Sequence, residues 1–187
     1  MKSIMERAII LLIISGIWTI PGPWGSLNAA EDPFSAANIL RIEEPRSAPE
    51  CALEDVQGKR VKLEDFRGKV VLLDFWATWC HHCRGELPSL VKLYNEFKNS
   101  GFVVLAIDRR EKKKIVQKYL EKKKLPFPVL LDTDGKIGNH YKVLALPDHF
   151  IIDRQGELIG RALGGRDWAS VETRNLIRFL VEQNKKK

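Results

Sequence analysis

The sequence predicts an α/β sandwich, in which helices cover a mixed sheet built around one hydrophobic core. Apolar runs typical of buried strands alternate along the chain with segments of helical periodicity. The composition, 44% hydrophobic and 29% charged residues, is that of a globular domain. The length of 187 residues suits one domain of ordinary size, and no internal repeat is present.

Residues 1–30 have the pattern of an export signal. Lys2 and Arg7 form a positive flank, and an apolar run follows from Ala8 to Ile20. This run is shorter than the roughly 20 residues of a membrane span but suits the core of a signal peptide. We expect residues 1–30 to be a signal peptide or, if retained, an N-terminal membrane anchor. Either outcome places the folded part outside the cytoplasm, in the periplasm or at the outer face of the cytoplasmic membrane.

Residues 31–47 are polar, contain prolines and show no sustained period, so we expect a linker. We assign residues 48–184 to the folded domain and the lysines at 185–187 to a basic tail. The net charge of +7 is concentrated in short lysine runs that fit solvated helix faces. These runs are not interleaved with aromatic residues, which argues against nucleic-acid binding.

The domain should begin with a hairpin over residues 51–56 and 60–63, turning at Gln57–Lys59. Residues 70–76 form a near-continuous apolar run, typical of a strand buried on both faces. A helix is expected over about 80–98, kinked by Pro88. Its apolar stripe consists of Leu87, Leu90, Val91, Tyr94 and Phe97.

The second half repeats the alternation of strands and helices. The expected elements are a strand over 102–108, a helix over 112–124, a strand over 127–131, a short helix near 137–141, a strand pair over 150–153 and 158–163, and a helix over 167–183. The inward positions expected on the two longer helices are Ile115, Val116, Tyr119 and Leu120, then Val171, Leu176, Ile177 and Leu180.

The candidate reactive site is the Cys80-x-x-Cys83 pair, where the buried strand meets the long helix. A cysteine at a helix N-terminus points its sulfur at unpaired backbone N–H groups, which stabilise the thiolate and lower its pKa. A second cysteine one turn later can close a disulfide with the first. We therefore assign Cys80 as the nucleophile and Cys83 as the resolving thiol of a redox-active disulfide.

Three other chemistries compete with this assignment. Zinc sites usually add a second Cys or His pair at ligand spacing, which the sequence lacks, so no metal ligands are assigned. A copper-binding chaperone using both thiols is the alternative function, because soft thiolates suit Cu(I). A peroxidase is disfavoured, since neither cysteine has the sequence context of a peroxidatic one.

The segment Asp74–Cys83 resembles the active-site segment of thioredoxins. The wider stretch from Ala48 to about Phe179 resembles the TlpA/ResA family of extracytoplasmic thioredoxin-like proteins. The matching pieces are Ala48-Pro49, the Leu53–Lys59 hairpin, Gly68–Val70, the CxxC segment, Glu86–Pro88, Leu146-Pro147, Phe150–Asp153 and Asp167-Trp168. The resemblance implies a thioredoxin fold with an N-terminal β-hairpin extension and dithiol–disulfide exchange, without an organic cofactor.

The resemblance also implies supporting roles for three residues. Pro147 matches the family's cis-proline, which lies opposite the CxxC pair and helps to bind the substrate backbone. Asp74 matches the acid beneath the active site, and we expect it to accept or relay the proton of Cys83. Glu86 shares a helix face with Cys83 and matches a glutamate credited with tuning thiol acidity or contacting partners.

Six further residues are singled out. The family usually has proline before the second cysteine, so His81 and His82 depart from it. A protonated imidazole beside Cys80 would favour the thiolate and make the protein more oxidising. Trp79, with Trp76, is expected to wall the site. Cys51 is interpreted as a small buried hydrophobe, and His149 either faces the CxxC pair, as a metal ligand or proton carrier, or faces away.

The sequence thus predicts an extracytoplasmic thiol–disulfide oxidoreductase acting on protein thiols or disulfides, in cytochrome c maturation or in disulfide formation. A membrane or extracytoplasmic redox partner must reset its disulfide. We expect a monomer. The sequence leaves open whether the protein is a net reductant or a net oxidant.

Overall fold

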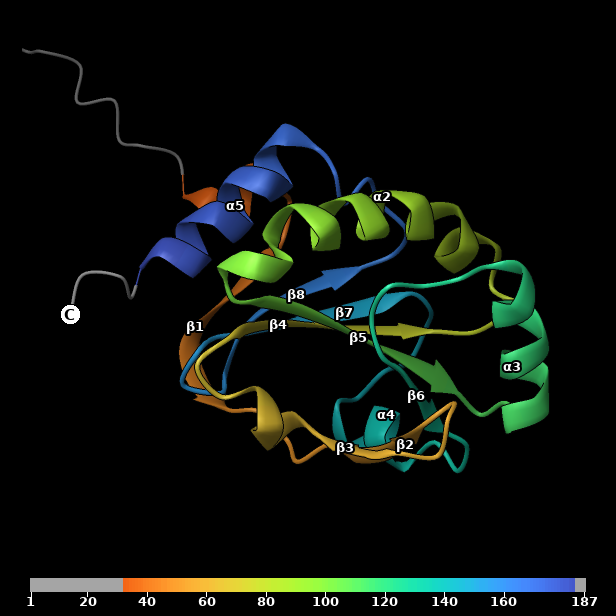
Figure 1. Cartoon of the computed structure of the whole chain (residues 1–187). Coiled ribbons are helices and arrows are strands. Elements are labelled where there is room, and N and C mark those ends of the chain that lie inside the picture. The colour runs from red at the N-terminus through yellow and green to blue at the C-terminus, as the bar shows by residue number, and fades with distance from the viewer. Residues whose placement is uncertain (1–31, 184–187) are drawn as a thin grey trace, which may run out of the picture. The chain divides into compact units, whose positions relative to one another are not determined.

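The computed structural model describes residues 32–183 and contains an eight-stranded mixed sheet flanked by helices (Figure 1). The strand order is β1-β8-β7-β4-β5-β6-β2-β3. The strands are β1 (Leu40–Ser47), β2 (Ala52–Asp55), β3 (Arg60–Lys62), β4 (Val70–Trp76), β5 (Phe102–Arg109), β6 (Val129–Asp132), β7 (Asp148–Ile152) and β8 (Glu157–Leu163). This is the predicted α/β architecture with a mixed central sheet, and the predicted hairpin is its β2–β3 edge.

The centre of the sheet is formed by β4, which runs parallel to β5 and antiparallel to β7. Every side chain of β4 is buried, as its apolar run predicts. Leu72 and Trp76 point to one core, whereas Leu73 and Phe75 point to the core on the opposite face. Because side chains alternate along a strand, Asp74 lies on the Leu72 and Trp76 face.

The Asp74 face is covered by the long helix α2 (His81–Phe97) and by α5 (Val171–Glu182), as Figure 1 shows. Helix α3 (Lys113–Lys122) contributes Val116 to the same core. Pro88 lies inside α2, as predicted, and the buried stripe of α2 continues through Leu90 and Phe97. The other face packs against α4 (Lys136–His140), the hairpin and the 3-10 helix Leu63–Phe66.

The expected linker is wrong for residues 33–47. They form the short helix α1 (Pro33–Ala36), whose Phe34 is buried, and the strand β1, which pairs antiparallel with β8. Almost all side chains of β1 are exposed, so the strand lacks the hydrophobic alternation by which strands are recognised. It is a polar edge strand, held by its backbone hydrogen bonds to β8.

Two residues predicted to face inward on their helices are instead exposed. Ile115 is 48% exposed and Val171 is 62% exposed. Each lies in the first turn of a helix, where the predicted stripe extends beyond the part of the helix that contacts the sheet. The other predicted core positions of α5, Leu176, Ile177 and Leu180, are buried.

Within residues 32–183, no helix is long and apolar enough to cross a membrane. The predicted signal peptide or anchor at 1–30 and the tail at 185–187 lie outside the described residues.

Candidate redox site

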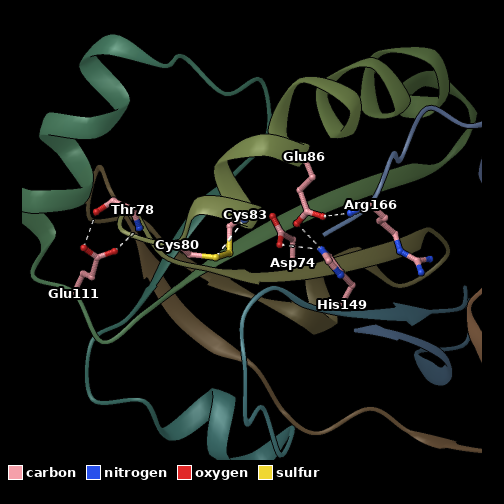
Figure 2. Close-up of a disulfide and its surroundings, with 8 residues drawn as sticks. All are labelled: Asp74, Thr78, Cys80, Cys83, Glu86, Glu111, His149 and Arg166. Atoms are coloured by element: carbon pink, nitrogen blue, oxygen red, sulfur yellow. Dashed lines mark hydrogen bonds and ion pairs between the residues drawn. A yellow bond between two sulfur atoms is a disulfide. The ribbon is translucent and has the colours of Figure 1, made fainter. Parts of the chain in front are cut away.

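Cys80 and Cys83 form a disulfide at the N-terminus of α2 (Figure 2). Cys80 is the N-cap residue of the helix, and its Sγ accepts a hydrogen bond of 3.2 Å from the backbone N–H of Cys83. The side chains of Cys80 and Cys83 are 6% and 1% exposed, respectively. The N–H groups of the first helical turn therefore face the outer sulfur, which is the geometry that stabilises a thiolate.

A buried cluster of Asp74, Glu86 and His149 lies on the Cys83 side of the disulfide (Figure 2). Asp74 and His149 are direct partners in the β4–β7 ladder, and Glu86 lies one helical turn after Cys83 on α2. One ligating atom from each side chain lies within 4.8 Å of the other two. A metal ion held by these atoms would displace the protons that they share.

His149 connects the cluster to the sheet. Its Nε2 lies 2.9 Å from Glu86 Oε1, a hydrogen bond, and 3.4 Å from Asp74 Oδ1. Its Nδ1 lies 3.1 Å from the carbonyl oxygen of Ala162 on β8, and its ring packs against Trp168 at 4.6 Å between centroids. Burial alone lowers the pKa of His149, but the contacts with Asp74 and Glu86 outweigh it and raise the pKa to about 9.

Glu86 is held at both carboxylate oxygens. Oε1 meets His149, and Oε2 accepts a hydrogen bond of 3.1 Å from the backbone N–H of Arg166. Burial raises the pKa of Glu86 above its usual range, although the hydrogen bond to His149 works against this. In contrast, neither carboxylate oxygen of Asp74 has a hydrogen-bond partner among the described residues.

Asp108 and Glu111 form a second buried acidic pair. Asp108 is the register partner of Trp76 on β4, and Glu111 lies across the disulfide from Asp74 (Figure 2). Glu111 accepts hydrogen bonds from the backbone N–H of Thr78 at 2.6 Å and from the Thr78 hydroxyl at 2.7 Å (Figure 2). It thereby fixes the turn that leads into Cys80. Burial, followed by the contact with Glu111, raises the pKa of Asp108 to about 8. At neutral pH Asp108 is therefore mainly a neutral acid.

Of the remaining predicted site residues, Pro147 is buried, and His81, His82 and Trp79 are exposed. The Leu146–Pro147 peptide bond is cis. His81 and His82 are exposed in the first turn of α2, with ring centroids 5.8 Å apart. Trp79 is 68% exposed and so does not pack in the core, as Trp76 does, because its turn points outward. It lines a hollow of about 400 Å³ with residues that include Arg110, Leu144 and Leu146.

Cys51 is buried and unpaired in the described part of the chain, and it belongs to the core on the far face of the sheet. Burial, with a contribution from the charge of Asp132, raises its pKa to about 12. A thiol with that pKa is a poor nucleophile at neutral pH.

Sequence reasoning left the orientation of His149 open and missed Asp108 and Glu111. Glu111 and Thr78 are 33 positions apart, and no local pattern links them. The position of Asp108 could have been predicted from the sequence. It ends an apolar strand parallel to the Asp74 strand, and the ends of such strands lie at one edge of the sheet.

A thioredoxin-like sheet with a CxxC disulfide at the N-terminus of its first long helix defines the class of thiol–disulfide oxidoreductases. The chain belongs to the AhpC/TSA family, whose model matches residues 45–161. It is 35% identical over 161 residues to the thiol-disulfide oxidoreductase ResA of Bacillus cereus, covering 86% of this chain and 88% of the relative. With ResA of Bacillus subtilis the identity is 39% over 118 residues, covering 63% of this chain and 66% of the relative.

The solved structures agree with this assignment. A crystal structure from Chlorobium tepidum, described as a thiol:disulfide interchange protein DsbE, superposes with a TM-score of 0.70 and 32% sequence identity. The match covers 75% of this chain and 99% of that one. The predicted resemblance and fold class are thus confirmed.

Proposed function

We propose that this protein is an extracytoplasmic oxidoreductase that exchanges disulfides with protein substrates through Cys80 and Cys83. The observation that carries the proposal is the placement of both sulfurs, within bonding distance, at the N-terminus of α2. The apolar segment at residues 8–20 supports export. The pathway that we propose is cytochrome c maturation or disulfide formation, as the resemblance to the TlpA/ResA family implies.

The exchange has two steps. In the reduced protein, the Cys80 thiolate attacks a substrate disulfide, forms a mixed disulfide and releases one substrate thiolate. Cys83 then loses its proton and attacks Cys80 Sγ, which closes the Cys80–Cys83 bond and releases the second substrate thiolate. The substrate gains two electrons, and the protein pair loses two. A redox partner outside the cytoplasm reverses the change.

Asp74 is the acceptor that we propose for the Cys83 proton. Its carboxylate is fully buried and has no hydrogen-bond partner among the described residues, an arrangement that is normally unfavourable. The structure holds the disulfide, in which Cys83 has no proton. An S–H group formed on reduction would supply the missing donor.

The substrate chain would dock beside Trp79 and Pro147. The hollow there is apolar at Trp79, Leu144 and Leu146 and positively charged at Arg110. Leu144 is 95% exposed and Trp79 is 68% exposed, so both can pack against a partner. His81 and His82 lie on the open side of the disulfide, where an imidazolium would favour the Cys80 thiolate.

The test is disulfide exchange with insulin, together with the reduction potential measured in glutathione buffers. We expect exchange by the wild-type protein, loss of it in Cys80→Ser, a trapped mixed disulfide in Cys83→Ser, and no change in the control Cys51→Ala. A potential near about −270 mV would indicate a reductant, and one near about −120 mV an oxidant. Absence of exchange, with stoichiometric Cu(I) bound to both thiols, would instead indicate a copper chaperone.

A further inference from the structure

We propose that His149 is a positioning residue that retains one proton between its Nε2 and Glu86 Oε1, and so leaves Asp74 free to take the proton of Cys83. The proposal rests on the exchange function above and assigns a role to a residue outside the CxxC segment.

The Nδ1 atom of His149 contacts the backbone of β8. It faces the carbonyl oxygen of Ala162 at 3.1 Å, and a carbonyl oxygen can only accept a hydrogen bond. Nδ1 therefore carries a hydrogen in every protonation state of the cluster. All change of charge on this ring is confined to Nε2, the nitrogen that faces the two carboxyl groups.

The Nε2 atom of His149 faces the carboxyl groups of Asp74 and Glu86. At 2.9 Å from Glu86 Oε1, it must share a proton with that oxygen, because two acceptors cannot form a hydrogen bond. The proton can lie on either atom, and in both cases the pair as a whole is neutral. Asp74 Oδ1, at 3.4 Å, is left outside this bond.

Without the imidazole, Asp74 and Glu86 would be two neighbouring buried carboxyl groups. Two buried carboxyl groups this close share one proton, because both cannot ionise at low cost. Asp74 would then take part in holding a proton before Cys83 offers one. With His149 present, Glu86 has its own proton partner, and Asp74 stays available.

Among residues 32–183, His149 is the only basic side chain that pairs with Asp74 or Glu86. The titratable groups that face the ring are Asp74 from β4 and Glu86 from α2, and Asp74 lies between the ring and the disulfide (Figure 2). The Arg166 guanidinium lies over Trp168 and donates to the carbonyls of the α1–β1 segment, so it does not bond to the carboxylates. Arg161 pairs with Asp148 on the opposite face of β7.

The experiment mixes the fully reduced protein with Ellman's reagent in a stopped-flow instrument from pH 5 to 9. The first thionitrobenzoate released reports attack by Cys80, and the second reports the resolving attack by Cys83. The variants are His149→Gln and, as a matched control on the same face of β7, Ile151→Val. Isoleucine-to-valine changes in a core typically lower stability by about 0.5–1.5 kcal/mol without altering charge.

In His149→Gln we expect the first phase to be unchanged and the pH midpoint of the second phase to rise by about one unit. The second phase would then be about tenfold slower below both midpoints, and it would recover at high pH. The control should keep the wild-type midpoint. A second phase slowed equally at every pH, or not slowed, would overturn the proposal. Absence of both phases in the wild-type protein would overturn the exchange function instead.

Should His149→Gln fail to fold, nitrogen chemical shifts of the His149 ring in the wild-type protein give a second test. We expect Nδ1 to remain protonated throughout, and the Nε2 titration midpoint to differ between the disulfide and dithiol forms, because linked sites shift each other reciprocally. Identical midpoints in the two forms would contradict the proposal.

Discussion

Two buried acidic pairs lie beside β4 and the turn that leads into the disulfide, and they differ in their partners. Asp74 and Glu86 both lie beside the imidazole of His149 (Figure 2). In the second pair Glu111 binds Thr78, and Asp108 has no hydrogen-bond partner among the described residues. Where a base is present, a proton can be held without occupying Asp74. Where none is present, the pKa of Asp108 rises to about 8 and the acid stays neutral. The first pair is the one that we propose for proton exchange, and Glu111 of the second pair binds the turn at Thr78.

The comparison is tested most strongly by removing one acid from each pair. Asp74→Asn should slow the resolving step by about a hundredfold at pH 7, the usual contribution of a positioned proton acceptor. Asp108→Asn should leave the rate within about twofold, because an amide resembles a neutral acid in shape. Ellman stopped-flow kinetics measures both. Equal losses in the two variants would show that the pairs do not differ in function.

Glu111→Ala should destabilise the fold by about 2 kcal/mol, since it leaves the Thr78 N–H and hydroxyl without their acceptor. Urea denaturation measures the loss. The exposed Glu121 on α3 provides the control, and its alanine variant should stay within about 0.5 kcal/mol of wild type. A stable Glu111→Ala protein would remove the structural role assigned to this pair.

The free energy of unfolding should depend on pH in a different window for Asp108 than for His149. Asp108 binds a proton in the folded state up to about pH 8 but in the unfolded state only to about pH 4. His149 keeps its proton to about pH 9 when folded and to about pH 6.5 when unfolded. In both cases the folded state binds more protons, so the free energy of unfolding falls as pH rises through these windows.

Asp108→Asn should remove up to about 1.4 kcal/mol per pH unit of this fall between about pH 4 and 8. The fall between about pH 6.5 and 9 that is due to His149 should remain. Urea titrations at several pH values measure both windows. An unaltered slope in Asp108→Asn would mean that Asp108 is ionised in the folded protein.

The smallest expected effect belongs to Thr78→Val. The variant keeps the backbone N–H bond to Glu111 and loses only the hydroxyl bond, so the loss should be about 1 kcal/mol. If urea denaturation shows a loss as large as that of Glu111→Ala, the hydroxyl rather than the backbone N–H holds the turn.

The sequence predicted the parts of this site that follow from local periodicity. Glu86 follows Cys83 by one helical turn, and Asp74 interrupts an apolar strand, so both stood out. His149 could face either core, because its side depends on where β7 begins, and β7 begins at Asp148 rather than at Phe150. The Thr78–Glu111 contact depends on how β4 and α3 meet in space, which no pattern along the chain specifies.

The edge of the sheet farthest from the hairpin was missed for a different reason. Strand β1 is recognisable only through its pairing with β8, since its own side chains are polar and exposed. The strand is held by backbone hydrogen bonds to β8, which cannot be predicted from the hydrophobic pattern of the sequence.

That edge has a practical consequence for anyone who shortens the protein. The Arg166 guanidinium donates to the carbonyls of Ala37 and Asn38, while its backbone N–H donates to Glu86. Expression from residue 48 would therefore strip β8 of its neighbour, leave an open strand that invites self-association, and loosen the anchor of a redox-site carboxylate. A fragment that starts at Asp32 keeps α1 and β1 and so avoids all three effects.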